Sequence, residues 1–153
     1  MPRAAAIRVS PDTIASIYRP GAGGLTRLPL FMARIPAGFP SPADDYVDGT
    51  LDLNELLVRH PAATFFVRVS GDSMTGAGIH SGDVLVVDRA ESARNRSVII
   101  AALNGELTVK RLVREGGRVC LVSENPDYPP MEVTGETQFE VWGVVVHVIR
   151  SLK

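Results

Sequence analysis

The dipeptide Asn104-Gly105 constrains the fold of this chain more than any other feature, because it separates two β-rich runs, 97–103 and 106–113. Both central positions of a type I′ turn need a positive φ, which asparagine and glycine adopt at low cost, so the pattern indicates a β-hairpin. Gly116-Gly117 precedes another run, 118–123, in the same way. The middle of the chain therefore predicts an antiparallel sheet.

Other segments extend this pattern. Residues 64–70 and 83–88 are rich in β-forming residues, and 139–149 reads as a long last strand with Gly143 at a bulge. Asp52 and Glu55 form a capping box that opens a short helix, which Pro61 closes. We therefore expect a mainly β fold, an antiparallel body with one or two short helices.

The first 37 residues differ from the rest of the chain. They hold five arginines and one acidic residue, a net charge of +4, whereas the remainder carries 11 basic and 16 acidic residues, a net charge of −5. Prolines recur through this segment, and no apolar period of 2 or 3.6 persists in it. We expect residues 1–37 to form an extended or mobile arm, and residues 38–153 to form the folded domain. A terminus without any role fits the same composition.

Composition excludes several classes of protein. The net charge of −1 provides no overall basic field for nucleic acid. The one cysteine, Cys120, excludes an intramolecular disulfide framework and a four-cysteine metal site. The apolar runs fall far short of the roughly 20 residues that span a bilayer, and the first ten residues lack a secretory apolar region. We expect a cytoplasmic protein without a membrane contact.

Ser73 is a candidate nucleophile, because the sequence SGDSM (70–74) lies where the predicted strand 64–70 ends. A serine at a strand-to-turn junction can project its hydroxyl clear of the sheet, and the N–H groups of the turn can then face a developing oxyanion. An ordinary turn fits the same residues, since glycine, aspartate and serine are common turn residues.

Lys110 is a candidate base. The chain has 14 arginines but only two lysines, Lys110 and Lys153. A desolvated lysine can lose its proton near neutral pH, which an arginine cannot, and the neutral amine can accept a proton from a serine hydroxyl. A lysine on the exposed face of a strand is the plainer interpretation of the same position.

The histidines offer weaker candidates. His60 and His80 lie in turn-rich segments, and His147 lies in an apolar run typical of a sheet face. The sequence shows no HxH, HxxxH or HExxH spacing and no GxxxxGK[ST] loop, so we expect neither a metal site nor a cofactor.

Three sequence blocks carry a resemblance to a known family. They are AGFPSPADDYVDGTLDLNELLVRHPAATFFVRVSGDSM (37–74), Gly82-Asp83 and NGELTVKRL (104–112). With them the chain resembles the UmuD-type proteins of the LexA group of self-cleaving serine peptidases, over nearly all of residues 28–150. The resemblance implies the LexA/UmuD C-terminal fold and a Ser/Lys dyad, with Ser73 as nucleophile and Lys110 as general base. It places the scissile bond between Ala37 and Gly38, so that cleavage would remove the arm.

The resemblance also implies partners. A LexA repressor carries a DNA-binding domain before its cleavage site, whereas the 37 residues that precede Gly38 lack a helix-turn-helix pattern. Direct sequence-specific DNA binding is therefore not expected. The resemblance is instead to the accessory subunit of SOS mutagenesis, a homodimer that cuts itself on a RecA–single-stranded-DNA filament and then joins a UmuC-type Y-family polymerase in translesion synthesis.

The segment 27–31 (RLPLF) adds one further expectation. Leu28, Leu30 and Phe31 resemble the xLxLF pattern by which partners dock on a sliding clamp, and an apolar anchor that packs the arm on its own body fits them equally well. Two other functions fit the whole chain. One is a non-catalytic module that bridges polymerase and clamp, and the other is a phage or plasmid regulator that cleaves a different protein. Cleavage within one chain and cleavage between chains both remain open.

Overall fold

The computed structural model describes residues 8–9, 14–21, 27–31 and 47–153. These residues fall into two units. The first, called the body, combines the described residues up to Pro20 with 60–153, and the second covers the described residues between Gly21 and Arg59. No helix of the described residues is long and apolar enough to cross a membrane.

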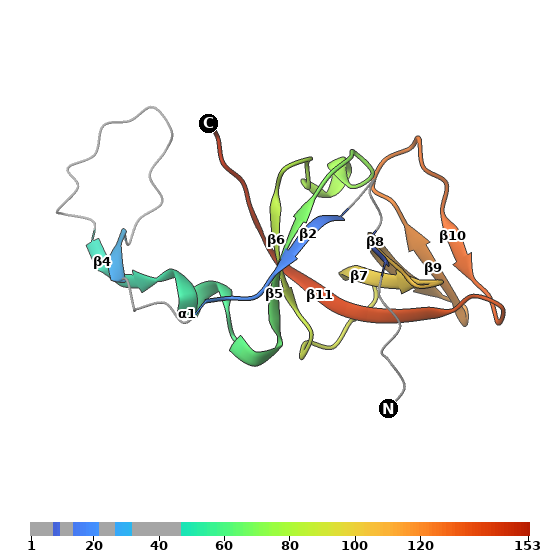
Figure 1. Cartoon of the computed structure of the whole chain (residues 1–153), viewed down its shortest axis with the longest axis horizontal. Helices are drawn as coiled ribbons and strands as arrows, with labels where there is room; N and C mark the ends of the chain where they lie inside the picture. The colour runs from blue at the N-terminus through green and yellow to red at the C-terminus, as the bar shows by residue number, and fades with distance from the viewer. Residues whose placement is uncertain (1–7, 10–13, 22–26, 32–46) are drawn as a thin grey trace. The chain divides into compact units, whose positions relative to one another are not determined.

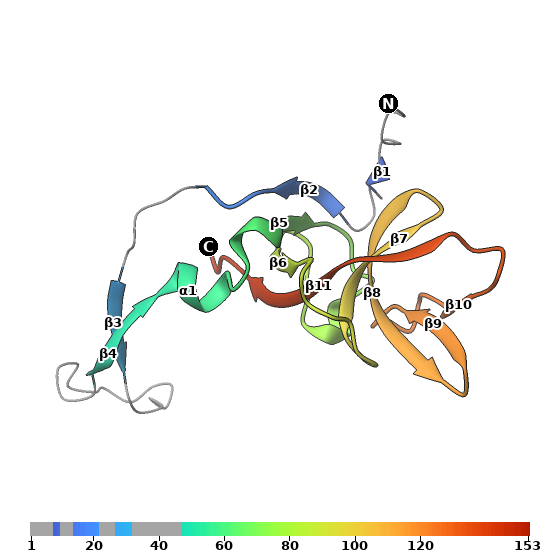
Figure 2. The same cartoon turned by 90° about the horizontal axis from the view of Figure 1, so that it is seen from below.

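The body is built on one sheet of nine strands. Eight of them follow the order β10-β9-β8-β7-β11-β6-β5-β2 with antiparallel neighbours, and β1 pairs parallel with β8 (Figures 1 and 2). The strands are β1 (Arg8–Val9), β2 (Ile14–Tyr18), β5 (Thr64–Val69), β6 (Val84–Asp88), β7 (Val98–Leu103), β8 (Glu106–Glu115), β9 (Arg118–Val122), β10 (Met131–Val133) and β11 (Phe139–Ile149). The predicted mainly β fold is confirmed.

The hairpins form where the sequence predicts them. Asn104 and Gly105 have φ values of 48° and 85°, and they join β7 to β8 in the register Leu103↔Glu106. Gly143 lies at a register shift of β11, where an added Cβ would come within 2.6 Å of a Val87 methyl carbon. Glycine is therefore required at this bulge by close packing.

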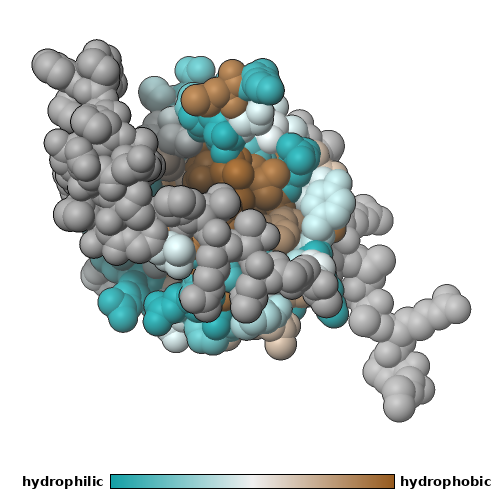
Figure 3. All heavy atoms as spheres, turned by 90° about the vertical axis from the view of Figure 1, so that its left-hand side faces the viewer, coloured by the Kyte–Doolittle hydropathy of each residue, from teal (hydrophilic) through white to brown (hydrophobic). Residues whose placement is uncertain are grey.

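Two clusters of buried side chains form the core. The cluster that positions the site combines Ile14 of β2 with Val67 and Val69 of β5, and it also holds Met74 and Ile79 from the segment after β5. A second cluster joins β7, β8, β9 and β11. Figure 3 shows a face on which brown apolar atoms gather within a border of teal polar atoms. Among the described apolar side chains left exposed are Val146, Val148 and Ile149 of β11.

The second unit contains a hairpin and a helix. β3 (Arg27–Phe31) pairs with β4 (Val47–Asp52), and α1 (Leu53–Leu57) follows. Asp52 caps the helix by accepting a hydrogen bond from the Asn54 N–H at 2.8 Å, as the sequence predicts. The helix ends at Leu57, and Pro61 instead begins the 3₁₀ turn η2 (Pro61–Ala63).

Part of the predicted arm is ordered in the sheet. Ile14–Tyr18 form β2 at the outer edge of β5, and Ile14 is only 1% exposed. The sequence did not predict this strand. The expected boundary between residues 37 and 38 lies outside the described residues, so the division into arm and domain stays a prediction.

Candidate active site

Ser73 lies in a tight turn directly after β5. The chain leaves the strand at Val69, turns at Gly71 with a φ of 82°, and enters the 3₁₀ turn η3 (Thr75–Ala77), which Gly78 ends with a φ of 80°. A side chain with a Cβ rarely adopts such positive φ values, so the two glycines allow the reversal. We call residues 70–78 the serine turn.

The loop after β9 holds the serine turn from outside. Asn125 Nδ2 donates to the Asp72 carbonyl oxygen at 2.8 Å, and the Tyr128 hydroxyl donates to Asp72 Oδ1 at 2.7 Å. The Gly76 N–H donates to the Glu124 carbonyl oxygen at 2.7 Å. A Cβ on Gly76 would lie 2.6 Å from that same oxygen, so the approach requires a glycine. These contacts fix the turn on both sides of Ser73.

Arg150 holds the end of the serine turn. Its Nη2 donates to the Gly78 carbonyl oxygen at 2.7 Å and to Asp83 Oδ2 at 2.6 Å, and its Nε donates to Asp83 Oδ1 at 2.8 Å. Asp83 is 2% exposed. The hydrogen bonds from Arg150 hold the pKa of the Asp83 carboxyl below its ordinary value, against the opposing effect of burial.

The Ser73 hydroxyl is buried and unpaired. Ser73 is 6% exposed, and its Oγ has no hydrogen-bond partner among the described residues. Leaving a buried hydroxyl unpaired costs about 1–3 kcal/mol, so this arrangement persists only because the surrounding turn imposes it. Beside it lies a hollow of about 10 Å³. The other residues that line the hollow are Val69, Ser70, Gly71, Met74, Ile79 and Val109.

The backbone beside Ser73 is also available. Among the hydrogen bonds between described residues, none uses the backbone N–H of Ser73 or Met74. Unpaired N–H groups next to a nucleophile are the groups that stabilise an oxyanion in acyl transfer. Within the described residues, the turn thus combines an unpaired hydroxyl with N–H groups that have no hydrogen-bond partner.

Lys110 lies in β8 opposite Ile99 of β7 and is half-buried. Burial lowers the pKa of its amine below the ordinary value of 10.5. Its Nζ donates to Thr108 Oγ1 at 3.4 Å, a long hydrogen bond. The amine borders a cavity of about 410 Å³, whose other lining residues are Leu103, Asn104, Glu106, Thr108 and Met131.

The structure brings the two candidates to adjacent positions without joining them. Val109 lines the hollow at Ser73, and Lys110 is the next residue of the same strand. No hydrogen bond joins Lys110 Nζ to Ser73 Oγ in the part of the chain that the structure describes.

A side-chain pair connects the strand of Lys110 to the supports of Ser73. Arg111, the neighbour of Lys110, forms an ion pair with Glu124, and its Nη1 donates to the Arg96 carbonyl oxygen at 2.6 Å. Glu124 in turn accepts from Gly76 through its backbone. The position of β8 relative to the serine turn is therefore set by direct contacts.

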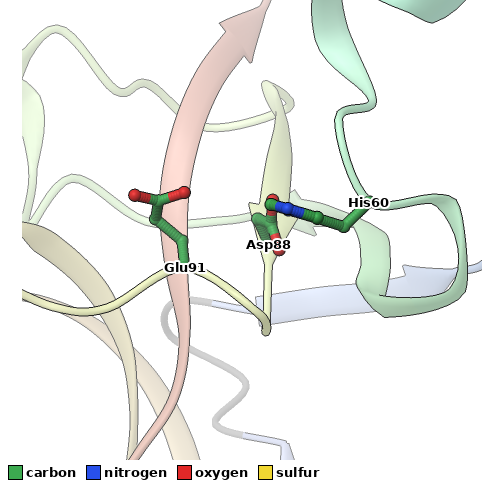
Figure 4. A group of neighbouring side chains, drawn as sticks. All are labelled: His60, Asp88 and Glu91. Atoms are coloured by element: carbon green, nitrogen blue, oxygen red, sulfur yellow. The ribbon is translucent and has the colours of Figure 1, made fainter.

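None of the three histidines lines the hollow at Ser73. His80 is exposed, and its backbone N–H donates to Asp83 Oδ2 at 2.8 Å, while His147 is half-buried in β11. His60 Nδ1 lies 2.6 Å from Asp88 Oδ2, and Glu91 is close enough to complete a three-residue group (Figure 4). The His60–Asp88 bond holds the start of η2 against the end of β6.

The structure says less about the predicted cleavage site and the predicted clamp contact. Ala37 and Gly38 lie outside the described residues. Leu28, Leu30 and Phe31 lie in β3, in a register that pairs Leu28 with Leu51. The clamp contact stays a prediction.

Sequence reasoning missed the residues that support the serine turn. Asn125 and Tyr128 lie in a loop, and their partner Asp72 is more than 50 positions away. No local period marks such a contact. The glycine at position 76 was the one available signal, since a glycine beside a nucleophile can indicate a close backbone approach.

Comparison with known proteins agrees with this geometry. Residues 29–146 match the family model described as Peptidase S24-like. The chain is 47% identical to the protein MucA of Salmonella typhimurium, over 83% of this chain and 87% of that protein. It is 49% identical to the protein SamA of Salmonella typhimurium strain LT2, over 80% of this chain and 87% of that protein. It is 39% identical to the LexA repressor of Bordetella petrii, over 92% of this chain and 63% of the repressor.

Proposed function

Because the chain belongs to the Peptidase S24-like family as a UmuD-type member, we propose that it is a serine peptidase that cleaves itself between Ala37 and Gly38. The observation that carries this proposal is the buried, unpaired hydroxyl of Ser73 in a turn held by Asp72, Gly76 and Gly78. A structural serine at this position would be paired. A nucleophile needs its hydroxyl free for a base and a substrate.

Each residue of the site has a chemical role in the proposed reaction. Neutral Lys110 takes the proton of Ser73, and the Ser73 oxygen attacks the carbonyl carbon of Ala37. The backbone N–H of Ser73 donates to the oxyanion that forms. The ammonium of Lys110 then protonates the nitrogen of Gly38 as the peptide bond breaks. A water molecule hydrolyses the ester on Ser73, which leaves a carboxylate on Ala37 and a free hydroxyl.

The reaction requires the Lys110 amine to come within hydrogen-bond distance of Ser73 Oγ. In the structure its amine is held by the long bond to Thr108, which costs little to break. We propose that a change of the Lys110 side-chain conformation brings the amine to Ser73.

The proposal extends to a cellular role. A RecA–single-stranded-DNA filament stimulates the cleavage, and the shortened chain, as a homodimer in the cytoplasm, assists a UmuC-type Y-family polymerase in translesion synthesis. The identities with MucA and SamA support this role. The exposed apolar side chains at the end of β11 support association with a second copy.

A second candidate function is a non-catalytic module that bridges the polymerase and the sliding clamp. The lack of a hydrogen bond between Lys110 Nζ and Ser73 Oγ among the described residues favours it. In that case Ser73→Ala would leave partner binding unchanged, and no condition would produce a cut chain.

Mass spectrometry after incubation with RecA, ATP and single-stranded DNA separates the two functions. We expect a new N-terminus at Gly38 in the wild-type chain and none in Ser73→Ala. Ser81→Ala, which removes an exposed serine of the body, is the matched control and should cleave normally. An intact wild-type chain, under conditions where MucA or LexA is cut, would contradict the peptidase.

A further inference from the structure

β2, which lies within residues 1–37, is an edge strand of the sheet of the body. It pairs antiparallel with β5, with Ile14 opposite Val69 and Tyr18 opposite Phe66. Among the described strands β5 has only β2 on this side, since its other neighbour is β6. Without β2, the backbone N–H and C=O groups of one edge of β5 would be open to another extended chain.

Side chains as well as backbone hold β2 in place. Ile14 is 1% exposed and belongs to the same buried cluster as Val69 and Met74, and Ile17 packs against that cluster. Just beyond the strand, the Arg19 guanidinium lies over the Phe65 ring, 5.3 Å from its centre. The edge of β5 thus accepts a particular pattern, with a branched apolar residue at one end and a cation at the other.

The proposed cleavage bond separates this strand from the strand that it covers. β2 precedes Ala37–Gly38 in the chain, and β5 follows it. In the intact chain β2 is tethered, so its effective concentration at the edge is on the order of millimolar. After cleavage the tether is lost, and a five-residue strand with one fully buried side chain is held only by its own contacts.

We propose that the edge of β5 is a strand-addition site, which β2 occupies in the intact chain and an extended segment of a partner protein occupies once the arm is cut. This inference rests on the proposed self-cleavage. The partner segment adds antiparallel to β5, with a β-branched apolar residue opposite Val69, a second apolar residue opposite Val67 and a cation near Phe65. It has no proline among the paired residues, because proline cannot donate to the ladder.

Binding of a short peptide to the full-length chain tests the site without requiring cleavage. The probe is a fluorescent peptide of residues 12–21 (DTIASIYRPG), and the protein carries Ser73→Ala so that it stays intact. Ile14→Asp in the protein places a carboxylate in the apolar cluster and should release β2. We expect this chain to bind the probe at least tenfold more tightly than the chain that keeps Ile14, because a docked β2 competes for the edge.

The control peptide carries aspartate in the place of Ile14 and should bind neither chain. The control protein carries Ala15→Ser at an exposed position of β2, and its binding of the probe should stay weak. If Ile14→Asp unfolds the body by circular dichroism, Ile17→Asp at the half-buried position takes its place. Equal probe binding with and without the substitution, or binding to neither chain, would overturn the proposal. Self-association of the substituted chain without probe binding would overturn the assignment to a partner protein.

The outcome is distinct from that of the proposed function. A wild-type chain that never cuts itself would contradict the peptidase while leaving the peptide result intact. A chain that cuts itself normally, but whose cut form binds the probe no better than the intact form, would contradict the strand-addition site alone.

Discussion

The serine turn and the Lys110 amine differ in how firmly hydrogen bonds hold them. The serine turn is held at Asp72, Gly76 and Gly78 by contacts of 2.7–2.8 Å, and its hydroxyl is buried without a partner. The Lys110 amine has one described hydrogen bond, of 3.4 Å, to Thr108, and none to Ser73. In the proposed reaction the nucleophile is therefore held in place, while the base has yet to form its hydrogen bond to it.

This difference suggests how such a chain can remain uncut. A nucleophile without its base is inactive, since a serine hydroxyl is a weak nucleophile at its own pKa. In the proposed reaction, a change in the Lys110 side chain that forms its hydrogen bond to Ser73 then separates the resting form from the active form. We therefore expect changes at Lys110 to lower the rate of self-cleavage. Changes around the serine turn should lower both the free energy of unfolding and the rate of self-cleavage.

The largest effect is expected at Lys110. Lys110→Ala removes the base, and Lys110→Arg keeps a cation that cannot lose its proton, so each should lower the rate of self-cleavage at least about a thousandfold. Both rates are followed by mass spectrometry of the Gly38 product. The exposed Lys153→Arg is the control and should cleave at the wild-type rate. Cleavage by Lys110→Arg at more than a tenth of that rate would exclude a lysine base.

Gly76→Ala should loosen the serine turn. The added Cβ would lie 2.6 Å from the Glu124 carbonyl oxygen, so the turn and the loop must separate, at a cost of about 1–3 kcal/mol in the free energy of unfolding. Urea denaturation measures this loss, and the cleavage rate should fall with it. Gly135→Ala, where an added Cβ meets nothing within 4 Å, should leave both quantities unchanged. Equal effects of the two substitutions would show that the close approach is unimportant.

The sequence predicts the hairpin and the position of Ser73 better than it predicts β2 and the orientation of the Lys110 side chain. Asn104-Gly105 predicts its hairpin because the turn is encoded by adjacent residues, and Ser73 stands out because it follows a strand. β2 escapes prediction because it is short, lies in a segment rich in proline and glycine, and is stabilised by Val67 and Val69, about 50 positions away. The orientation of Lys110 likewise depends on the packing of β8, which no local pattern encodes.

Acid should loosen the end of the serine turn, where Arg150 joins Gly78 to Asp83. The pKa of Asp83 is lowered by Arg150, so the pair stabilises the fold fully above the unfolded-state pKa of about 3.9, and this stability is lost as the pH falls through the lower folded-state pKa. Arg150→Gln should reduce proton uptake on acid unfolding by up to about one proton. The exposed Arg94→Gln should leave it unchanged. The same acid-unfolding curve for Arg150→Gln and wild type would contradict this role of the pair.

The smallest effect is expected at Tyr128. Tyr128→Phe removes the 2.7 Å hydrogen bond to Asp72 Oδ1, which is worth about 1 kcal/mol at most in this exposed position. The cleavage rate should fall about two- to fivefold, with an unchanged dependence on pH. Tyr18→Phe, at an exposed residue of β2, is the control. A shifted pH dependence in Tyr128→Phe would mean that the loop acts on the base and not on the nucleophile.

The rate of self-cleavage as a function of pH tests most directly whether Lys110 is the base of Ser73. Burial lowers the pKa of the amine, so we expect the cleavage rate at Ala37–Gly38 to rise with pH. The rate should be half-maximal at a pH below 10.5 and level off above that pH. A rate that stays flat between about pH 7 and 10, or a Lys110→Ala chain that cleaves with the same profile, would contradict the assignment.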